Sequence, residues 1–180
     1  MKSQWAVVTG GSSGIGAAII ERLILQEPSL CCLAIGRRSP QHFAFSGATD
    51  RIRRVSADIS TPDGISAIVL ALPEDACVKY LIHNAGLLGP IAPLSECDRS
   101  AWCQIVETNL SAPLFLTKAL IPQLNRCSGD DNSGAKARVL HVSSGAAHTP
   151  YVGWGPYCVT KAGLYMMYRC LSMDYHPTEY

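Results

Sequence analysis

Short apolar runs alternate with amphipathic stretches along this 180-residue chain, and that order limits the possible folds more than any single element does. Several of the runs are apolar throughout, which is typical of strands buried on both faces. The pattern predicts strands at 5–9, 31–36, 53–57, 78–83 and 138–143, and helices at 14–26, 62–71, 100–126 and 156–174. A repeated strand–helix order predicts an α/β domain whose parallel sheet has helices on both faces.

Two prolines fall within the long predicted helix at 100–126. Proline has no backbone N–H to donate and its ring crowds the preceding turn. We therefore expect Pro113 to bend or interrupt the helix, and Pro122 is a candidate for an earlier helix end.

Length and charge exclude several classes of protein. A chain of 180 residues suits one domain, here 1–180, that buries about two-thirds of its unfolded surface. The net charge is +1, and the densest basic cluster, at 51, 53 and 54, is more often the solvated end of a strand than a nucleic-acid site. The apolar runs are too short to cross a bilayer and no secretory signal is visible. We expect a cytoplasmic protein that binds neither nucleic acid nor membrane.

The eight cysteines show no CxxC pair and no metal-ligand spacing, so no metal site is predicted. We expect them to be mostly buried thiols in a reducing compartment, and not a disulfide framework.

A glycine-rich turn follows the first predicted strand and leads directly into a helix. Backbone amides at a helix start carry partial positive charge, and glycine allows a pyrophosphate to approach closely. The simpler interpretation is a flexible loop between strand and helix. The position of the glycine-rich turn, between the first strand and the first helix, favours a dinucleotide site instead. The candidate cofactor-binding residues are Gly10, Ser12, Ser13, Gly14, Ile15 and Gly16.

Tyr157 and Lys161 lie four residues apart on a predicted helix, so they share one face. A phenol releases its proton near pH 10 unaided, and a fixed positive charge nearby favours the phenolate. The pair is therefore a candidate acid/base device for a carbonyl or an alcohol, although a helical tyrosine and lysine at this spacing are often surface residues. Ser144 lies thirteen residues before the tyrosine.

The TGxxxGxG spacing, the YxxxK pair and the preceding serine occur here in the order found in the classical short-chain dehydrogenase/reductase family. The chain resembles that family over essentially its whole length. The resemblance implies a Rossmann-type doubly wound sheet with strand order 3-2-1-4-5, and an enzyme that moves a hydride between a nicotinamide cofactor and a small carbonyl or alcohol substrate.

The residues after the second strand bear on which cofactor is used. An NAD-dependent enzyme is expected to place an acid there, whereas this chain has Gly36 followed by Arg37 and Arg38. An arginine can pair with a 2′-phosphate that an acid would repel. We therefore expect NADP(H), with NAD(H) the less favoured cofactor, unless both arginines merely cap an exposed loop.

Further cofactor contacts are implied by the resemblance. Asp58, with Ile59 beside it, matches the aspartate that meets the adenine ring, although it could simply cap a helix. Asn84, Ala85 and Gly86 resemble the family's NNAG signature, with His83 in place of its first asparagine, and could otherwise be a strand-ending turn.

The resemblance also assigns catalytic roles. Tyr157 would be the general acid in the reduction direction, and Ser144 would hydrogen-bond the same substrate oxygen. Lys161 would act electrostatically and bind the nicotinamide ribose, while Asn109 would hold a water that relays protons to the lysine. Asn109 could otherwise be an ordinary helix-interior residue. Ser143 competes for the serine role, but the family spacing selects Ser144.

The loop between the serine and the tyrosine is rich in aromatic residues. Candidate substrate-lining residues are His148, Tyr151 and Trp154, with Leu87, Leu88 and Tyr165. Residues 153–158 look somewhat like those of the sepiapterin reductase and benzil reductase members. An aromatic or pterin carbonyl is the expected substrate.

The chain stops at Tyr180, nineteen residues after Lys161, whereas members of the family continue through further strands and a substrate loop. We expect a chain that is short at its C-terminus, with its fifth strand at a sheet edge that another chain could pair with. The alternative function is an NADP(H)-binding or oligomerising subunit with little turnover. The resemblance also implies a homo-oligomer.

Overall fold

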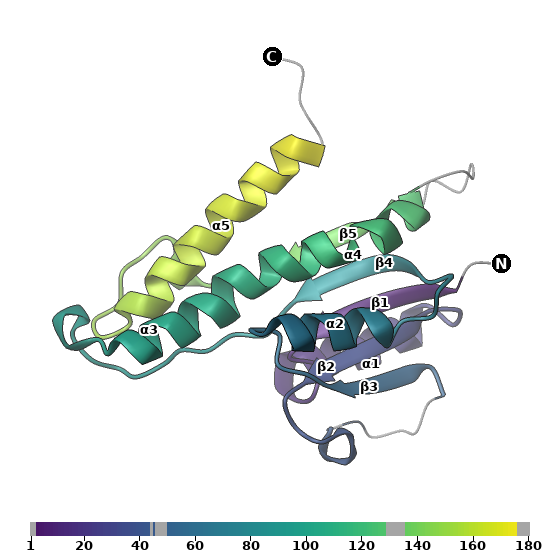
Figure 1. Ribbon diagram of the computed structural model, residues 1–180, viewed down its shortest axis with the longest axis horizontal. Helices are drawn as coiled ribbons and strands as arrows, with labels where there is room; N and C mark the ends of the chain where they lie inside the picture. The colour runs from purple at the N-terminus through teal and green to yellow at the C-terminus, as the bar shows by residue number, and fades with distance from the viewer. Residues whose placement is uncertain (1–2, 44, 46–49, 129–135, 176–180) are drawn as a thin grey trace. The chain divides into compact units, whose positions relative to one another are not determined.

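The computed structural model describes residues 3–43, 45, 50–128 and 136–175 (Figure 1). They form two compact units, one from Met1–Ala85 and Phe115–Leu140, the other from Gly86–Leu114 and His141–Tyr180. The strands are β1 (Gln4–Thr9), β2 (Cys31–Gly36), β3 (Ile52–Ser56), β4 (Cys77–His83) and β5 (Arg138–His141). The α-helices are α1 (Gly14–Gln26), α2 (Pro62–Leu70), α3 (Arg99–Val106), α4 (Ala112–Ser128) and α5 (Gly155–Tyr175).

The strands form one sheet in the order β3-β2-β1-β4-β5. The β1 strand pairs in parallel with both β2 and β4, so that Val7 lies opposite Leu33 on one side and Leu81 on the other. All three residues are fully buried, as the apolar runs predict for central strands. The predicted α/β fold and its strand order are confirmed.

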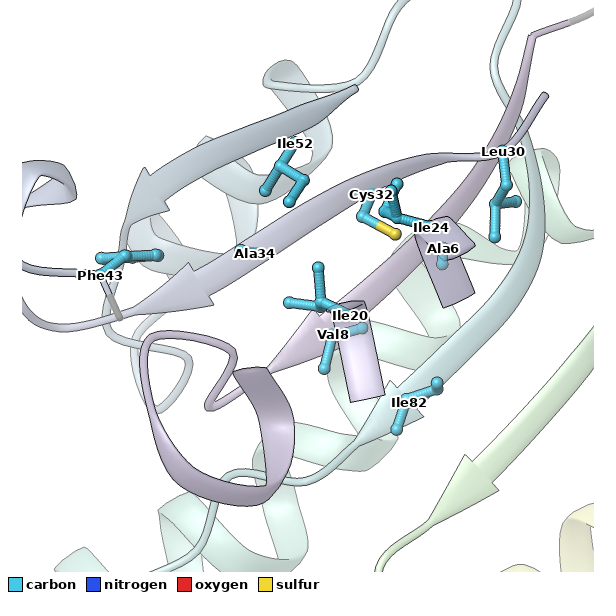
Figure 2. Packing of buried hydrophobic residues seen from close by; sticks show 10 residues of the cluster. All are labelled: Ala6, Val8, Ile20, Ile24, Leu30, Cys32, Ala34, Phe43, Ile52 and Ile82. Carbon is cyan, nitrogen blue, oxygen red and sulfur yellow. The ribbon is translucent and has the colours of Figure 1, made fainter. Parts of the chain in front are cut away.

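One layer of the core lies between α1 and the sheet, within the first unit (Figure 2). Alternate residues of β1, Ala6 and Val8, point to the same face because side chains alternate along a strand. Ile20 and Ile24 of α1 meet them there, since residues four apart share a helix face. Figure 1 shows α1 behind the sheet and α2 in front of it. This packing fixes the start of α1 at the end of β1.

The α4 helix is bonded to β4 at several points within the first unit. His83 Nε2 lies 2.9 Å from Thr117 Oγ1, and Cys77 forms a disulfide with Cys127, with 4.9 Å between their Cα atoms. The expectation of mostly buried thiols is therefore wrong. Two of the eight cysteines are paired across fifty residues, and of the six free ones only Cys32 is buried.

The basic cluster of Arg51, Arg53 and Arg54 lies at the start of β3 and makes contacts within the first unit. The Arg51 guanidinium donates to the carbonyl groups of Ile24, Glu27 and Leu30, which lie at and just beyond the end of α1. Such carbonyls lack helical partners, and a positive charge there is favourable. The Arg53 guanidinium lies 5.2 Å from the centre of the Trp5 ring. Arg51 and Arg53 therefore make structural contacts within the first unit.

A π-helical segment, Glu107–Ser111, separates α3 from α4. Pro113, the second residue of α4, has no N–H to donate to the carbonyl of Asn109, its partner four residues earlier. The Ala112 N–H bonds to Glu107 O, five residues back. The predicted interruption at Pro113 is confirmed, whereas Pro122 lies inside α4 and does not end it.

Among the described residues, no helix has both the length and the apolar character that crossing a membrane requires.

Candidate functional site

The glycine-rich turn is held in place by both neighbouring strands of the first unit. Thr9 Oγ1 accepts from the backbone amides of Asn84 and Ala85 at 3.0 and 3.1 Å. The Asn84 side chain donates in return to the carbonyls of Thr9 and Gly10 at 3.1 and 3.2 Å. The Gly11 amide donates to Ile35 O at 2.8 Å. These hydrogen bonds tie the turn to the ends of both β2 and β4.

Three of its glycines have a geometric reason to be glycine. Gly10 and Gly14 have φ angles of 65° and 56°, which side-chain-bearing residues rarely adopt. A Cβ on Gly16 would lie 2.3 Å from Gly10 O. The turn thus folds back closely over the first residues of α1.

The start of α1 leaves its amide groups directed out of the helix. Ser13 is the N-cap residue, and within the described residues its side chain makes no capping hydrogen bond. The first turn of the helix also contains no acidic residue. Unsatisfied N–H groups and the positive end of the helix dipole are the features that bind a phosphate. This arrangement could hold a dinucleotide, with residues 12–16 binding its pyrophosphate.

Arg37 and Arg38 are both exposed directly after β2. Hydrogen bonds from the hydroxyl and amide of Ser60 hold the pKa of Asp58 below its ordinary value, and the charge of Arg37 acts in the same direction. Asp58 therefore braces a turn before α2, whose N-cap is Thr61. Ile59 beside it is buried. The adenine role of Asp58 stays a prediction.

In the second unit, α5 carries Tyr157 and Lys161 on one face, as their spacing predicts. Lys161 Nζ lies 5.6 Å from the centre of the Tyr157 ring. Only 5% of the lysine is exposed, and its ammonium donates to the Val142 carbonyl at 2.8 Å. Burial lowers the pKa of Lys161. The charge is thus held at a fixed place beside the phenol ring.

Asn109 lies in the π-helical segment and is 1% exposed. Its side-chain oxygen accepts from the Leu87 amide at 2.7 Å, and its side-chain nitrogen donates to Leu87 O at 2.8 Å and to Thr160 Oγ1 at 3.1 Å. A Cβ on Gly86 would lie 3.5 Å from Asn109 Oδ1 and 3.9 Å from Lys161 Nζ. Asn109, Gly86 and Lys161 therefore lie close together.

Ser144 begins the short 3₁₀ turn Gly145–Ala147, which packs against α5. Its hydroxyl oxygen accepts from the Ala146 amide at 3.2 Å. Among the described residues, no acceptor takes its proton, so the hydroxyl retains a donor for a substrate oxygen. Ser143 is more exposed and makes no such capping bond in the described part of the chain.

The aromatic residues predicted near the site form two groups in the second unit. The Trp154 ring packs against Tyr157 at an interplanar angle of 84° with 5.8 Å between ring centres, and its centre lies 5.2 Å from that of Tyr151. His148 packs against Tyr165 at 4.8 Å. Tyr151, Trp154 and Tyr157 thus form a continuous aromatic row.

Two residues were not singled out by the sequence reasoning. Thr9 accepts the hydrogen bonds that hold the end of β4 against the glycine turn. Thr160 connects Asn109 to the backbone of Tyr157. Each adjoins a motif residue, Gly10 or Lys161, but a threonine at such a position carries no chemical signal until its partners are known.

The comparisons with known proteins agree with this geometry. A family model described as short chain dehydrogenase matches residues 4–179. The chain is 29% identical to a benzil reductase ((S)-benzoin forming) of Bacillus cereus, over 98% of this chain and 71% of that protein. It is 32% identical to a sepiapterin reductase of Xenopus laevis, over 93% of this chain and 67% of that protein.

A solved structure gives the same picture. The closed form of a serine dehydrogenase complexed with NADP⁺ superposes with a TM-score of 0.83 at 26% identity, covering 97% of this chain and 67% of that one. The chain thus spans about two-thirds of the length of these relatives. On its sequence, its sheet order and these matches, the chain belongs to the short-chain dehydrogenase family of oxidoreductases.

Proposed function

We propose that this protein is an NADPH-dependent carbonyl reductase in which Tyr157 exchanges a proton with the substrate oxygen. The observation that carries the proposal is the pair on α5: a buried Lys161 ammonium, fixed by Val142 O, beside the Tyr157 ring. A surface pair would place both groups in solvent, where the charge would have little effect on the phenol.

The glycine turn supports the cofactor assignment. Ser12, Ser13, Gly14, Ile15 and Gly16 would hold the pyrophosphate through backbone amides at the uncapped start of α1. A side chain at Gly16 would collide with Gly10 O, so the turn requires glycine there. When bound, the cofactor supplies or accepts the hydride. Exposed Arg37 and Arg38 after β2 favour a 2′-phosphate, hence NADP(H) over NAD(H).

The chain's own residues would handle the proton and the developing charge. In the reduction direction, the Tyr157 hydroxyl gives its proton to the carbonyl oxygen, and the Lys161 charge stabilises the phenolate that remains. Ser144 keeps a free hydroxyl proton with which to donate to the same oxygen as it gains negative charge. General acid catalysis of this kind contributes about 10²- to 10⁴-fold.

The hydrogen bonds of Asn109 refine its proposed role in proton relay. Both of its side-chain N–H groups are used, on Leu87 O and Thr160 Oγ1. The backbone carbonyl of Asn109, in contrast, receives no N–H from Pro113. We propose that this carbonyl, and not the side chain, is the group that holds a relay water for Lys161.

The row formed by Tyr151, Trp154 and Tyr157 supports an aromatic carbonyl as substrate. An aryl ring can stack on or meet the edge of such a row, and each aromatic contact adds about 0.5–1.5 kcal/mol beyond its buried area. Two relatives are named as a benzil reductase and a sepiapterin reductase. Benzil carries its carbonyl groups next to aryl rings, and sepiapterin carries a carbonyl next to a pterin ring.

The test combines cofactor binding with turnover. NADPH fluorescence is titrated with the protein, and NADPH oxidation is followed with benzil, other aryl diketones and simple aliphatic ketones. The proposal expects binding, with faster oxidation in the presence of aryl diketones. Binding without turnover of any carbonyl would instead identify a nucleotide-binding subunit. Faster turnover of aliphatic ketones would reject only the substrate class.

A further inference from the structure

We propose that Thr160 is a positioning residue that sets the placement of Tyr157 and Lys161 against Asn109; this inference rests on the proposed function. Thr160 is fully buried in α5. Its hydroxyl donates to the Tyr157 carbonyl at 2.9 Å and accepts from the Asn109 side-chain nitrogen at 3.1 Å. Thr160 therefore joins the helix that carries the acid/base pair to the π-helical segment.

The number of available protons determines the direction of this chain of hydrogen bonds. A threonine hydroxyl has one proton, and here Tyr157 O receives it. The hydroxyl can then only accept from Asn109, whose second N–H is used on Leu87 O. The Asn109 oxygen in turn accepts from the Leu87 amide. Each N–H or O–H group in this chain therefore has one acceptor, and these bonds fit only one orientation of the Asn109 side-chain amide.

The three linked segments are the ones that carry the proposed chemistry. Tyr157 and Lys161 flank Thr160 on α5, and Leu87 follows Gly86, whose Cβ position lies 3.9 Å from Lys161 Nζ. Loss of the hydroxyl would leave a buried amide N–H of Asn109 without its acceptor, which is unfavourable. Rotation of that amide or a shift of α5 would relieve it. Either change moves the groups that must be aligned with the substrate.

A purely local explanation accounts for only half of these contacts. Threonine in a helix commonly bonds to a carbonyl three or four residues back, and the bond to Tyr157 O is of that kind. The bond from Asn109 comes from fifty-one residues away. A helix does not need this long-range hydrogen bond in order to form. That Thr160, the single threonine of α5, nevertheless accepts it supports a positioning role.

The experiment compares Thr160→Val, which keeps the shape and removes the hydroxyl, with Thr160→Ser, which keeps the hydroxyl. The kcat and KM for an aryl diketone, the Kd for NADPH and the melting temperature are measured for both variants and the wild type. A misplacement of the reacting groups by about 1 Å costs about 10²-fold in rate, so Thr160→Val should lower kcat about 10- to 100-fold. Its KM and NADPH Kd should change less than about threefold, and Thr160→Ser should stay near wild type.

Equal kcat values for the valine and serine variants, in an active wild type, would overturn the inference. Inactivity of the wild type itself would reject the proposed function instead. Thr160→Ala, which places no methyl group against the Asn109 amide, replaces the valine variant if that variant does not fold. If the alanine variant also fails to fold while the serine variant folds, Thr160 is a folding residue and its positioning role is rejected.

Discussion

Lys161 donates a hydrogen bond of 2.8 Å from its side-chain nitrogen to the backbone carbonyl of Val142, directly after β5. This bond ties the middle of α5 to the segment that leads into Ser144. The two residues are nineteen apart in the chain, and helical spacing gives no hint of the contact. It explains why the lysine charge stays buried beside Tyr157 instead of extending into solvent.

Arg37→Ala should weaken NADPH binding and leave NADH binding nearly unchanged. A hydrogen bond to a charged group contributes about 1.5–3 kcal/mol, so we expect the Kd for NADPH to rise about 10-fold or more. Fluorescence titration of both cofactors measures it, with Arg53→Ala as a control because that arginine contacts Trp5 and Ala71 O. Equal losses for NADPH and NADH would show that Arg37 does not read the 2′-phosphate.

Trp154→Leu should lower kcat/KM for aryl diketones more than for aliphatic ketones. The substitution removes the ring that contacts both Tyr151 and Tyr157. The loss of one aromatic contact predicts about a threefold to tenfold change in the ratio of the two kcat/KM values. Trp154→Phe, which retains a ring, should keep most of the preference. A uniform loss with both substrate types would indicate that Trp154 only supports the loop.

The sequence predicted the strands, the helices and the glycine turn because these depend on local patterns, whereas the strand order followed from the resemblance to the family. Apolar runs such as 31–36 predict buried strands, and a glycine-rich turn such as Gly10 to Gly16 predicts the start of a helix directly after it. The boundaries of α1 and β2 match the predicted ones. Local pattern alone was enough for these parts.

Other features depend on contacts between segments far apart in the chain. The Asn109–Thr160 bond and the Cys77–Cys127 disulfide join residues about fifty apart, and spacing along one chain cannot reveal them. Pro113 predicted an interruption of its helix, but it did not predict that the interruption would be a π-helical segment centred on Asn109. The side-chain hydrogen bonds of Asn109 could not be predicted from the sequence for the same reason.

His141 should make the protein less stable as the pH falls below about 6.5. Burial lowers the pKa of His141 to about 4, and the Lys161 charge acts in the same direction. Between these values the unfolded chain takes up a proton that the folded chain does not, so stability is complete above pH 6.5 and is lost towards pH 4. The loss from this residue amounts to at most about 3 kcal/mol.

Thermal unfolding between pH 4 and 8 measures this dependence. The His141→Asn variant should lose less stability than the wild type over that range. Parallel curves for the wild type and His141→Asn would contradict the assignment.

Reduction of the Cys77–Cys127 disulfide should destabilise the first unit. The bond joins the start of β4 to the end of α4, and a disulfide of this span contributes about 2–4 kcal/mol. Urea unfolding with and without dithiothreitol tests it, and a Cys77→Ser/Cys127→Ser double variant should not respond to the reductant. Eight titratable thiols in the protein before reduction would show that the bond is absent.

The most direct test of the central claim is the kcat of Tyr157→Phe for an aryl diketone, with the Kd for NADPH measured on the same sample. The substitution removes only the hydroxyl, and Tyr175→Phe, at the exposed end of the same helix, is its matched control. We predict a loss of about 10²- to 10⁴-fold in kcat for Tyr157→Phe, NADPH binding within about threefold of wild type, and near-normal kcat for Tyr175→Phe. Wild-type turnover by Tyr157→Phe would contradict it.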